Sequence, residues 1–190
     1  MKPMKRLSAS LFNTSTSNPK PPKHATNRRS CLGTSLVVGG TVLVMVAIAQ
    51  SALAQNLVRF SGGVGVIPTG SANTTVRGVA AAGQIWTIRD LAADVKQDGN
   101  IRLDGRGLLL ASGNAVGTNA NASVFATLFC ANDGNVPHSS TLAGVPLEVN
   151  GDFRIDDMLS PAPPNPCTGP VLLIRSAAGS MSWFAAGIPR

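Results

Sequence analysis

The chain has 190 residues, with 16 lysines and arginines against nine aspartates and glutamates, a formal charge of +7. Seven of the basic residues precede residue 30, where there is no acid, which leaves nine basic and nine acidic residues from Gln55 onward. This distribution argues against nucleic-acid binding by the body of the protein. Charged residues make up 13% and hydrophobic residues 44% of the chain, so it is too apolar to be a disordered charged tail.

Residues 1–54 have the three parts of a secretory signal. A long basic n-region precedes an apolar h-region within residues 32–49. Ala52 and Ala54 then occupy both small-residue positions of an Ala-x-Ala cleavage site. We expect cleavage after Ala54 and a mature protein that begins at Gln55.

Two alternatives to this signal remain open. Arg28 and Arg29 resemble a twin-arginine export signal, although the rest of the chain shows no cofactor site, which favours ordinary Sec export. Residues 32–53 also approach the ~20 residues that a membrane-spanning helix needs, which would make the protein N-terminally anchored. The alanine pair favours cleavage. We therefore expect a secreted, periplasmic or cell-envelope protein that meets the membrane only through its signal.

The remaining residues, 55–190, have the length of one domain. They contain two cysteines, Cys130 and Cys167, and an exported protein favours a disulfide between them. The third cysteine, Cys31, should leave with the signal. Residues 160–170 are rich in proline, which cannot donate to a central ladder, so they predict an extended surface loop held by Cys167.

Short apolar runs bounded by turn residues predict an all-β domain, because no stretch keeps the helical period. Residues 88–96 are the one helical candidate, but they lead into Asp98-Gly99, which favours a hairpin arm. Trp86 and Trp183 are expected in the core. In chain order, strands are expected at residues 85–88, 100–104, 108–111, 124–129, 152–156, 171–174 and 183–186.

The predicted strands fall into two kinds. Residues 100–104 and 152–156 alternate apolar and charged side chains, which indicates strands with one solvent-exposed face. Residues 108–111, 124–129 and 171–174 are apolar on both faces, which is typical of inner strands in packed layers. The sequence therefore predicts an antiparallel β-sandwich or a small barrel.

Residues 95–104 match residues 147–156 without a gap, at an offset of 52. Each copy contains a dipeptide, Asp98-Gly99 or Asn150-Gly151, that favours a type I′ hairpin turn. An aliphatic triplet and a Phe-Ala strand follow each copy. The match indicates two related β units with an approximate two-fold relation, and the alternative is convergent hairpin chemistry.

His138 is the only histidine after residue 54, and it is the candidate for an alternative function as a secreted hydrolase. Its neighbours Ser139 and Ser140 would point away from it on extended backbone, and no Gly-x-Ser-x-Gly motif occurs. Residues 136–140 are therefore interpreted as a polar loop. A single histidine excludes a multi-histidine zinc site, and bridged cysteines would exclude a thiolate site.

Two groups of oxygen-bearing residues are candidate calcium sites, but neither has the spacing of a calcium loop. Alternating Asp-Arg-Asp residues more often form a solvated face with weak cross-strand ion pairs. We expect no metal site and no cofactor. The two groups are Asp152, Asp156 and Asp157, and Asp98, Asn100 and Asp104.

Four segments together resemble a group of uncharacterised small exported bacterial proteins: residues 105–111, 124–130, 151–157 and 183–189. The resemblance implies an exported, single-domain protein and supplies no activity or site. The function expected from the sequence is a non-catalytic binding or structural module of the envelope or extracellular space. Its partner there is unknown, and no catalytic residue is assigned.

Overall fold

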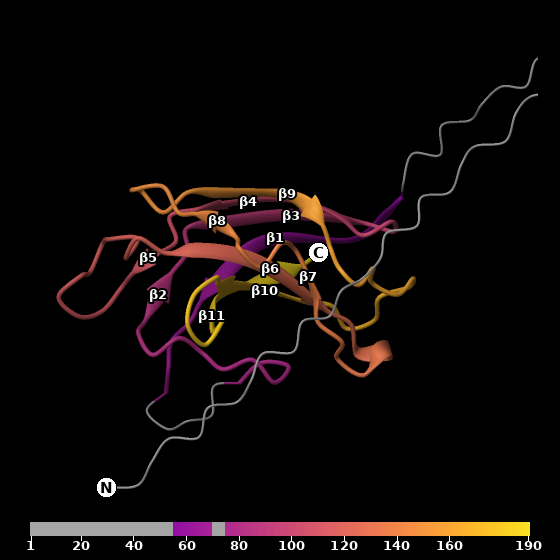
Figure 1. The fold of residues 1–190 in the computed structure, drawn as a ribbon, viewed down its shortest axis with the longest axis horizontal. Helices are drawn as coiled ribbons and strands as arrows, with labels where there is room; N and C mark the ends of the chain where they lie inside the picture. The colour runs from indigo at the N-terminus through magenta and orange to yellow at the C-terminus, as the bar shows by residue number, and fades with distance from the viewer. Residues whose placement is uncertain (1–54, 70–74) are drawn as a thin grey trace, which may run out of the picture. The chain divides into compact units, whose positions relative to one another are not determined.

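The computed structural model describes residues 55–69 and 75–190 (Figure 1). The predicted export signal, with Arg28, Arg29, Cys31, Ala52 and Ala54, lies outside the described residues. The described part contains eleven strands, one short 3₁₀ helix and no α-helix. In chain order the elements are β1 (Asn56–Gly65), β2 (Trp86–Thr87), β3 (Asp90–Lys96), β4 (Asn100–Arg106), β5 (Leu109–Leu110), β6 (Ser123–Phe129), η1 (Ala131–Asp133), β7 (His138–Ser139), β8 (Val145–Pro146), β9 (Phe153–Met158), β10 (Val171–Ser176) and β11 (Trp183–Pro189).

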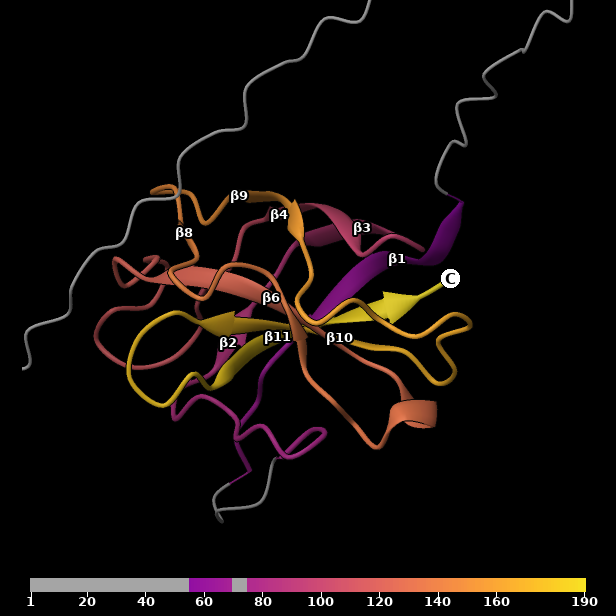
Figure 2. The ribbon, with the colours of Figure 1, turned by 45° about the vertical axis from the view of Figure 1, so that its right-hand side comes forward.

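Nine strands form one antiparallel sheet in the order β7-β6-β10-β11-β1-β3-β4-β9, with β8 also pairing with β6. The sheet nearly closes into a barrel, because β8 lies between β6 and β9, as Figure 2 shows from a second direction. Backbone hydrogen bonds in both directions between Ser139 and Ser160 join β7 to the residues after β9. Strands β2 and β5 form a small second sheet. The all-β prediction is confirmed, and of the two expected architectures the nearly closed sheet is closer to the barrel.

The alternation of side chains along β4 and β9 is as predicted. Ile101 and Leu103 are fully buried and Phe153 and Ile155 nearly so, while the charged residues between them face solvent. Residues 90–96 are a hairpin arm and not a helix. Strands β6 and β10 are buried on both faces.

Both tryptophans belong to the core, as predicted. Trp86 is 5% and Trp183 is 7% exposed. The Trp86 ring stacks on Phe184 with 4.1 Å between ring centroids. This contact joins the small sheet to the main sheet.

The sequence did not predict β1, which lies between β3 and β11 in the sheet. Its last five residues include three glycines, which have no side chain to pack and weaken a strand pattern. The structure gives Gly65 a specific role, because a Cβ there would lie 2.0 Å from the carbonyl oxygen of Trp86. Glycine thus allows β2 to approach the backbone of β1.

The two predicted turns adopt the same geometry, but it is not type I′, which needs positive φ at both central residues. Only the glycines Gly99 and Gly151 have positive φ, at 89° and 80°. The amide of Gly99 donates to the Lys96 carbonyl at 3.0 Å, and the amide of Gly151 donates to the Glu148 carbonyl at 2.8 Å. Each turn therefore ends in a left-handed glycine, as in three-residue hairpin loops.

The internal match has a structural counterpart in the β4–β9 pair. Leu103 lies opposite Ile155, which is its equivalent in the match, so the two segments are related by a local two-fold axis through this pair. The relation does not extend to two units of the barrel. Beyond its turn, the second hairpin has one backbone hydrogen bond, from the Glu148 amide to the Asp152 carbonyl, whereas the first hairpin continues as the paired strands β3 and β4. The aliphatic segments that follow the two copies also differ, because residues 109–110 and 171–176 lie in different sheets.

Candidate functional site

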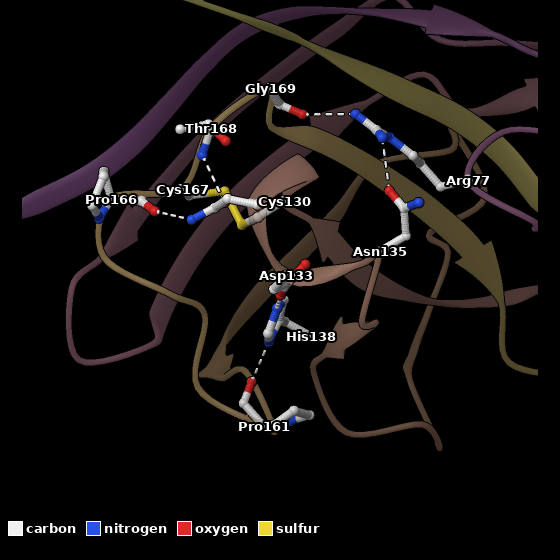
Figure 3. The surroundings of a disulfide bond; sticks show 11 residues. Arg77, Cys130, Asp133, Asn135, His138, Pro161, Pro166, Cys167, Thr168 and Gly169 are labelled. Atoms are coloured by element: carbon white, nitrogen blue, oxygen red, sulfur yellow. Dashed lines mark hydrogen bonds and ion pairs between the residues drawn. A yellow bond between two sulfur atoms is a disulfide. The ribbon is translucent and has the colours of Figure 1, made fainter.

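Cys130 and Cys167 form a disulfide, as predicted, with 5.1 Å between their Cα atoms (Figure 3). Cys130 directly follows β6, and Cys167 lies in the proline-rich loop. Residues 161–170 contain no strand, which agrees with the predicted extended connection. The disulfide therefore attaches this loop to the end of a central strand.

Hydrogen bonds join the same two segments independently of the disulfide. The amide of Ala131 donates to the Thr168 carbonyl at 2.7 Å. The Asn132 side chain donates to the Pro166 carbonyl at 2.8 Å and accepts from the Thr168 amide at 3.1 Å. The residues beside both cysteines are thus held by at least three further contacts.

His138 is not in a polar loop, as the sequence had indicated, but in β7, and its side chain is 3% exposed. Its Nδ1 lies 2.8 Å from the Pro161 carbonyl oxygen, and its Nε2 lies 2.5 Å from Asp133 Oδ2. A carbonyl only accepts, so Nδ1 carries a proton. Both ring nitrogens are therefore engaged (Figure 3).

The serines next to His138 bond elsewhere. The Ser139 hydroxyl lies 3.0 Å from that of Thr127, and the Ser140 hydroxyl accepts from the Ala126 amide at 3.0 Å. Neither forms a hydrogen bond with His138. Within residues 55–69 and 75–190 the structure supplies the carboxylate of a catalytic triad, but it brings no serine hydroxyl into hydrogen-bond contact with the histidine.

Asp133, which the sequence analysis did not single out, brings the histidine and the disulfide into one cluster. One ligand atom each of Cys130, Asp133 and His138 lies within 4.8 Å of the others. Asp133 Oδ1 is buried and has no hydrogen-bond partner in the part of the chain that the structure describes. The signal in the sequence is short: the aspartate stands three residues after a cysteine and five before the only histidine of the domain.

An open groove of about 530 Å³ lies between β7, the end of β9 and β10. Its polar lining consists of hydroxyls and one arginine, Arg175, and no acidic residue lines it. We call it the Arg175 groove. The lining residues are Pro137, Ser139, Ser140, Thr141, Leu142, Met158, Ser160, Arg175 and Met181.

Arg175 is half-buried and has no carboxylate partner within ion-pair distance in the described part of the chain. Its guanidinium lies 5.1 Å from the ring centroid of Phe125, and its Nε donates to the Met181 carbonyl at 2.8 Å. Burial lowers the pKa of Arg175, because desolvation disfavours the charged form. An arginine nevertheless stays protonated in proteins.

The phenylalanine beneath Arg175 lies outside the main hydrophobic core. Phe125 is fully buried, yet it does not belong to the cluster that contains Val124, Ala126 and Leu128. The guanidinium of Arg175 lies above its ring.

A second hollow offers less to a ligand. It has a volume of about 460 Å³ and lies near Trp86 and Phe184. Its lining is mostly alanine and serine and contains no charged residue. It offers no charged group to pair with a charged ligand, so the Arg175 groove is the stronger candidate for such a ligand.

The aspartates considered for calcium lie apart and have other partners. Asp104 pairs with Arg154 at 2.6 Å, and Asp156 pairs with Arg102 at 3.0 Å. Both arginine side chains are 72% exposed. These contacts are the solvated cross-strand pairs that the alternation predicted.

Searches of protein-family models, curated proteins and solved structures return no match for this chain. Within residues 55–69 and 75–190, no helix is long and apolar enough to cross a membrane. The Cys130–Cys167 disulfide is consistent with a location outside the cytoplasm.

Proposed function

We propose that this protein is an exported, non-catalytic binding module whose Arg175 groove holds small amphipathic carboxylates. The observation that carries the proposal is a half-buried arginine without a carboxylate partner in the described chain, lining a groove without acidic residues. Buried charges are usually paired, because an unpaired one is costly. A carboxylate ligand would supply the missing partner.

The groove suits both ends of such a ligand. A guanidinium presents a planar set of donors that matches a carboxylate. Leu142 and Met158 line the same groove and are 49% and 58% exposed, so they offer apolar surface to a short hydrocarbon group. The volume falls within the range of small-molecule sites, about 300 to 1,000 Å³.

The state of His138 supports binding over the alternative of hydrolysis centred on that residue. A general base needs a nitrogen within reach of the proton that it removes. Both nitrogens of His138 face acceptors within the protein, and His138 does not line the groove.

Export is the second part of the proposal. The Ala52-Leu53-Ala54 sequence and the disulfide both support it. Mass spectrometry of the protein recovered outside the cytoplasm should find Gln55 as the first residue. Retention of residues 32–53 would instead show an N-terminal anchor.

Binding is tested by isothermal titration calorimetry with octanoate and N-acetyl-leucine. These two probes separate a fatty acid from the carboxyl end of a peptide, and octanamide is the neutral control. We expect a saturable carboxylate signal that Arg175→Gln weakens at least about tenfold, because a hydrogen bond to a charged group contributes ~1.5 to 3 kcal/mol. Arg175→Lys should recover only part of it, because an ammonium lacks the planar fork.

The matched control is Arg106→Gln, which removes an exposed arginine at the end of β4. It should leave the affinity unchanged. Leu142→Asp, at an exposed position in the groove, should abolish binding without unfolding the protein. Equal binding of octanoate and octanamide, or equal effects of the Arg175 and Arg106 variants, would contradict the proposal.

A further inference from the structure

We propose that the disulfide cluster is a redox-gated metal site. When a thiol reductant opens the Cys130–Cys167 bond, the two thiolates, His138 Nε2 and the Asp133 carboxylate form a four-ligand site for zinc or a similar divalent cation. This inference concerns a different part of the molecule from the Arg175 groove and does not depend on it.

The four groups are already together in the oxidised protein. The ligand atoms of Cys130, Asp133 and His138 lie within 4.8 Å of one another, and the sulfur of Cys167 is bonded to that of Cys130 (Figure 3). Zinc accepts such a mixture of sulfur, nitrogen and oxygen ligands in tetrahedral geometry. Calcium and magnesium, which prefer oxygen ligands, would not be held by it.

His138 has the orientation of a metal ligand. Its Nδ1 donates to the Pro161 carbonyl at 2.8 Å, which leaves Nε2 directed at the carboxylate of Asp133. A backbone carbonyl on the far nitrogen of a ligating histidine fixes both its tautomer and its ring orientation. A metal would bind between Nε2 and the carboxylate, which already face each other.

Asp133 supplies an independent sign that the cluster lacks a partner. Its Oδ1 is buried and has no hydrogen-bond partner among the described residues, although buried polar atoms are almost always bonded. The disulfide beside it is neutral and offers no donor. A cation bound to the carboxylate would remove this deficit.

The segments that carry the cysteines should stay together after reduction. The contacts of Ala131 and Asn132 with residues 166–168 do not involve sulfur. On the other side, Arg77 donates to the Gly169 carbonyl at 3.0 Å and to the Asn135 side chain at 2.7 Å. Reduction therefore frees two thiols that remain adjacent.

The chemistry balances with one dithiol reductant. Two electrons from it break the sulfur–sulfur bond, two protons make the two thiols, and the dithiol becomes a disulfide. Binding of the metal then releases the two thiol protons, as is general for thiolate sites.

The test is a titration of the protein with Co²⁺, whose visible spectrum reports tetrahedral coordination and whose near-ultraviolet band reports thiolate ligands. Competition with Zn²⁺ then gives the zinc affinity. All samples carry Cys31→Ser, so that only the two cysteines of the cluster contribute. A phosphine reductant replaces thiols, which would themselves bind the metal. We expect tetrahedral thiolate spectra from the reduced protein and none from the oxidised protein.

Variants separate the full site from a pair of thiols. Cys130→Ser with Cys167→Ser should bind no better than the oxidised protein. His138→Gln and Asp133→Asn keep both thiols, and each should weaken Zn²⁺ binding at least about tenfold, since even outer ligands change affinity by 10- to 100-fold. Asp94→Asn, an exposed aspartate in β3, is the control and should have no effect.

Circular dichroism and thermal melting complete the test. Reduction without metal should lower the melting temperature while the β-sheet signal persists, and Zn²⁺ should raise the melting temperature again. If reduction unfolds the protein, Zn²⁺ should refold it, because binding energy is then folding energy. Equal cobalt spectra before and after reduction, a His138→Gln affinity equal to the unmutated one, or no effect of Zn²⁺ on the reduced protein would overturn the proposal.

Discussion

His138 and Arg175 differ in how many hydrogen-bond donors their surroundings leave free for a ligand. His138 is 3% exposed, and protein acceptors engage both of its nitrogens. Arg175 is half-buried and donates from Nε to the Met181 carbonyl, but it meets no carboxylate in the described residues. Because a guanidinium has five N–H groups, Arg175 keeps donors for a ligand whereas His138 does not. For this reason we propose Arg175, and not His138, as the residue that binds the ligand.

Phe153 and Arg154 test the assignment of the two faces of β9. Phe153 is 5% exposed, and its ring occupies the space above Gly105, where a Cβ would lie 2.2 Å from ring atoms. Phe153→Ala should therefore lower the free energy of unfolding by ~3 to 5 kcal/mol. Arg154→Ala removes a largely exposed ion pair with Asp104 and should cost less than about 1 kcal/mol. Urea denaturation measures both, and the reverse order would mean that the faces are assigned wrongly.

For single residues, the sequence predicted which side chains face the core wherever the alternation along a strand determines it. Ile101, Leu103 and Phe153 face the core because side chains alternate along a strand, and a slip of one residue would expose them all. The environment of Arg175 could not be predicted in this way. Phe125, which lies beneath its guanidinium, is 50 residues earlier in the chain, and only the pairing of β6 with β10 brings the two together.

At the scale of elements, the barrel has an incompletely paired line, the seam between β6 and β9. These strands are not paired with each other, and β7 and β8 lie in the gap. Asp157 at the end of β9 crosses the seam, because its Oδ2 accepts from the Thr141 amide at 2.7 Å. This bond, together with one from the Met158 amide, lowers the pKa of Asp157 below its ordinary 3.8, against the opposing effect of burial.

The seam should therefore weaken in acid. A carboxyl whose pKa is lower in the folded state contributes stability above its unfolded pKa, and this stability is lost as the pH falls through the folded pKa. For Asp157 the loss occurs below about pH 3.8. Asp157→Asn should lower the free energy of unfolding at neutral pH and reduce its dependence on acid. Asp156→Asn, at the neighbouring solvent-facing position, should change the neutral-pH stability less.

Chemical denaturation of the unmutated protein and of both variants, at neutral pH and below pH 3.8, gives the free energies of unfolding to compare. An Asp157→Asn protein with unchanged neutral-pH stability would show that the bond to Thr141 does not hold the seam.

The elements found from sequence are those whose pattern is complete within the strand. The strands that fall within or close to the predicted ranges are β2, β3, β4, β5, β6, β9, β10 and β11. β1 was missed because its glycines serve contacts with Trp86 and Leu91, not a periodic pattern. β7 has two residues, His138 and Ser139, and its polar composition predicted a loop. In the structure these residues pair with β6, and the histidine is buried.

In the whole molecule, β7 links the two proposed sites. Successive side chains of a strand point to opposite faces, so His138 enters the disulfide cluster while Ser139 lines the Arg175 groove. The proline-rich loop links them again, since Ser160 lines the groove and Pro161 holds His138. The nearly closed barrel thus brings together a binding surface and a disulfide that the sequence presents as separate features.

The central claim is that Arg175 receives the carboxylate of the ligand, and side-chain NMR tests it most directly. Titration of ¹⁵N-labelled protein with octanoate should shift the Nε–H resonance of Arg175 and the amides of Thr141 and Leu142 along one saturable curve. The Nε–H resonance of Arg106 should stay in place, and octanamide should shift none of them. An unchanged Arg175 resonance while octanoate perturbs the hollow near Trp86 and Phe184, or perturbs nothing, would contradict the account.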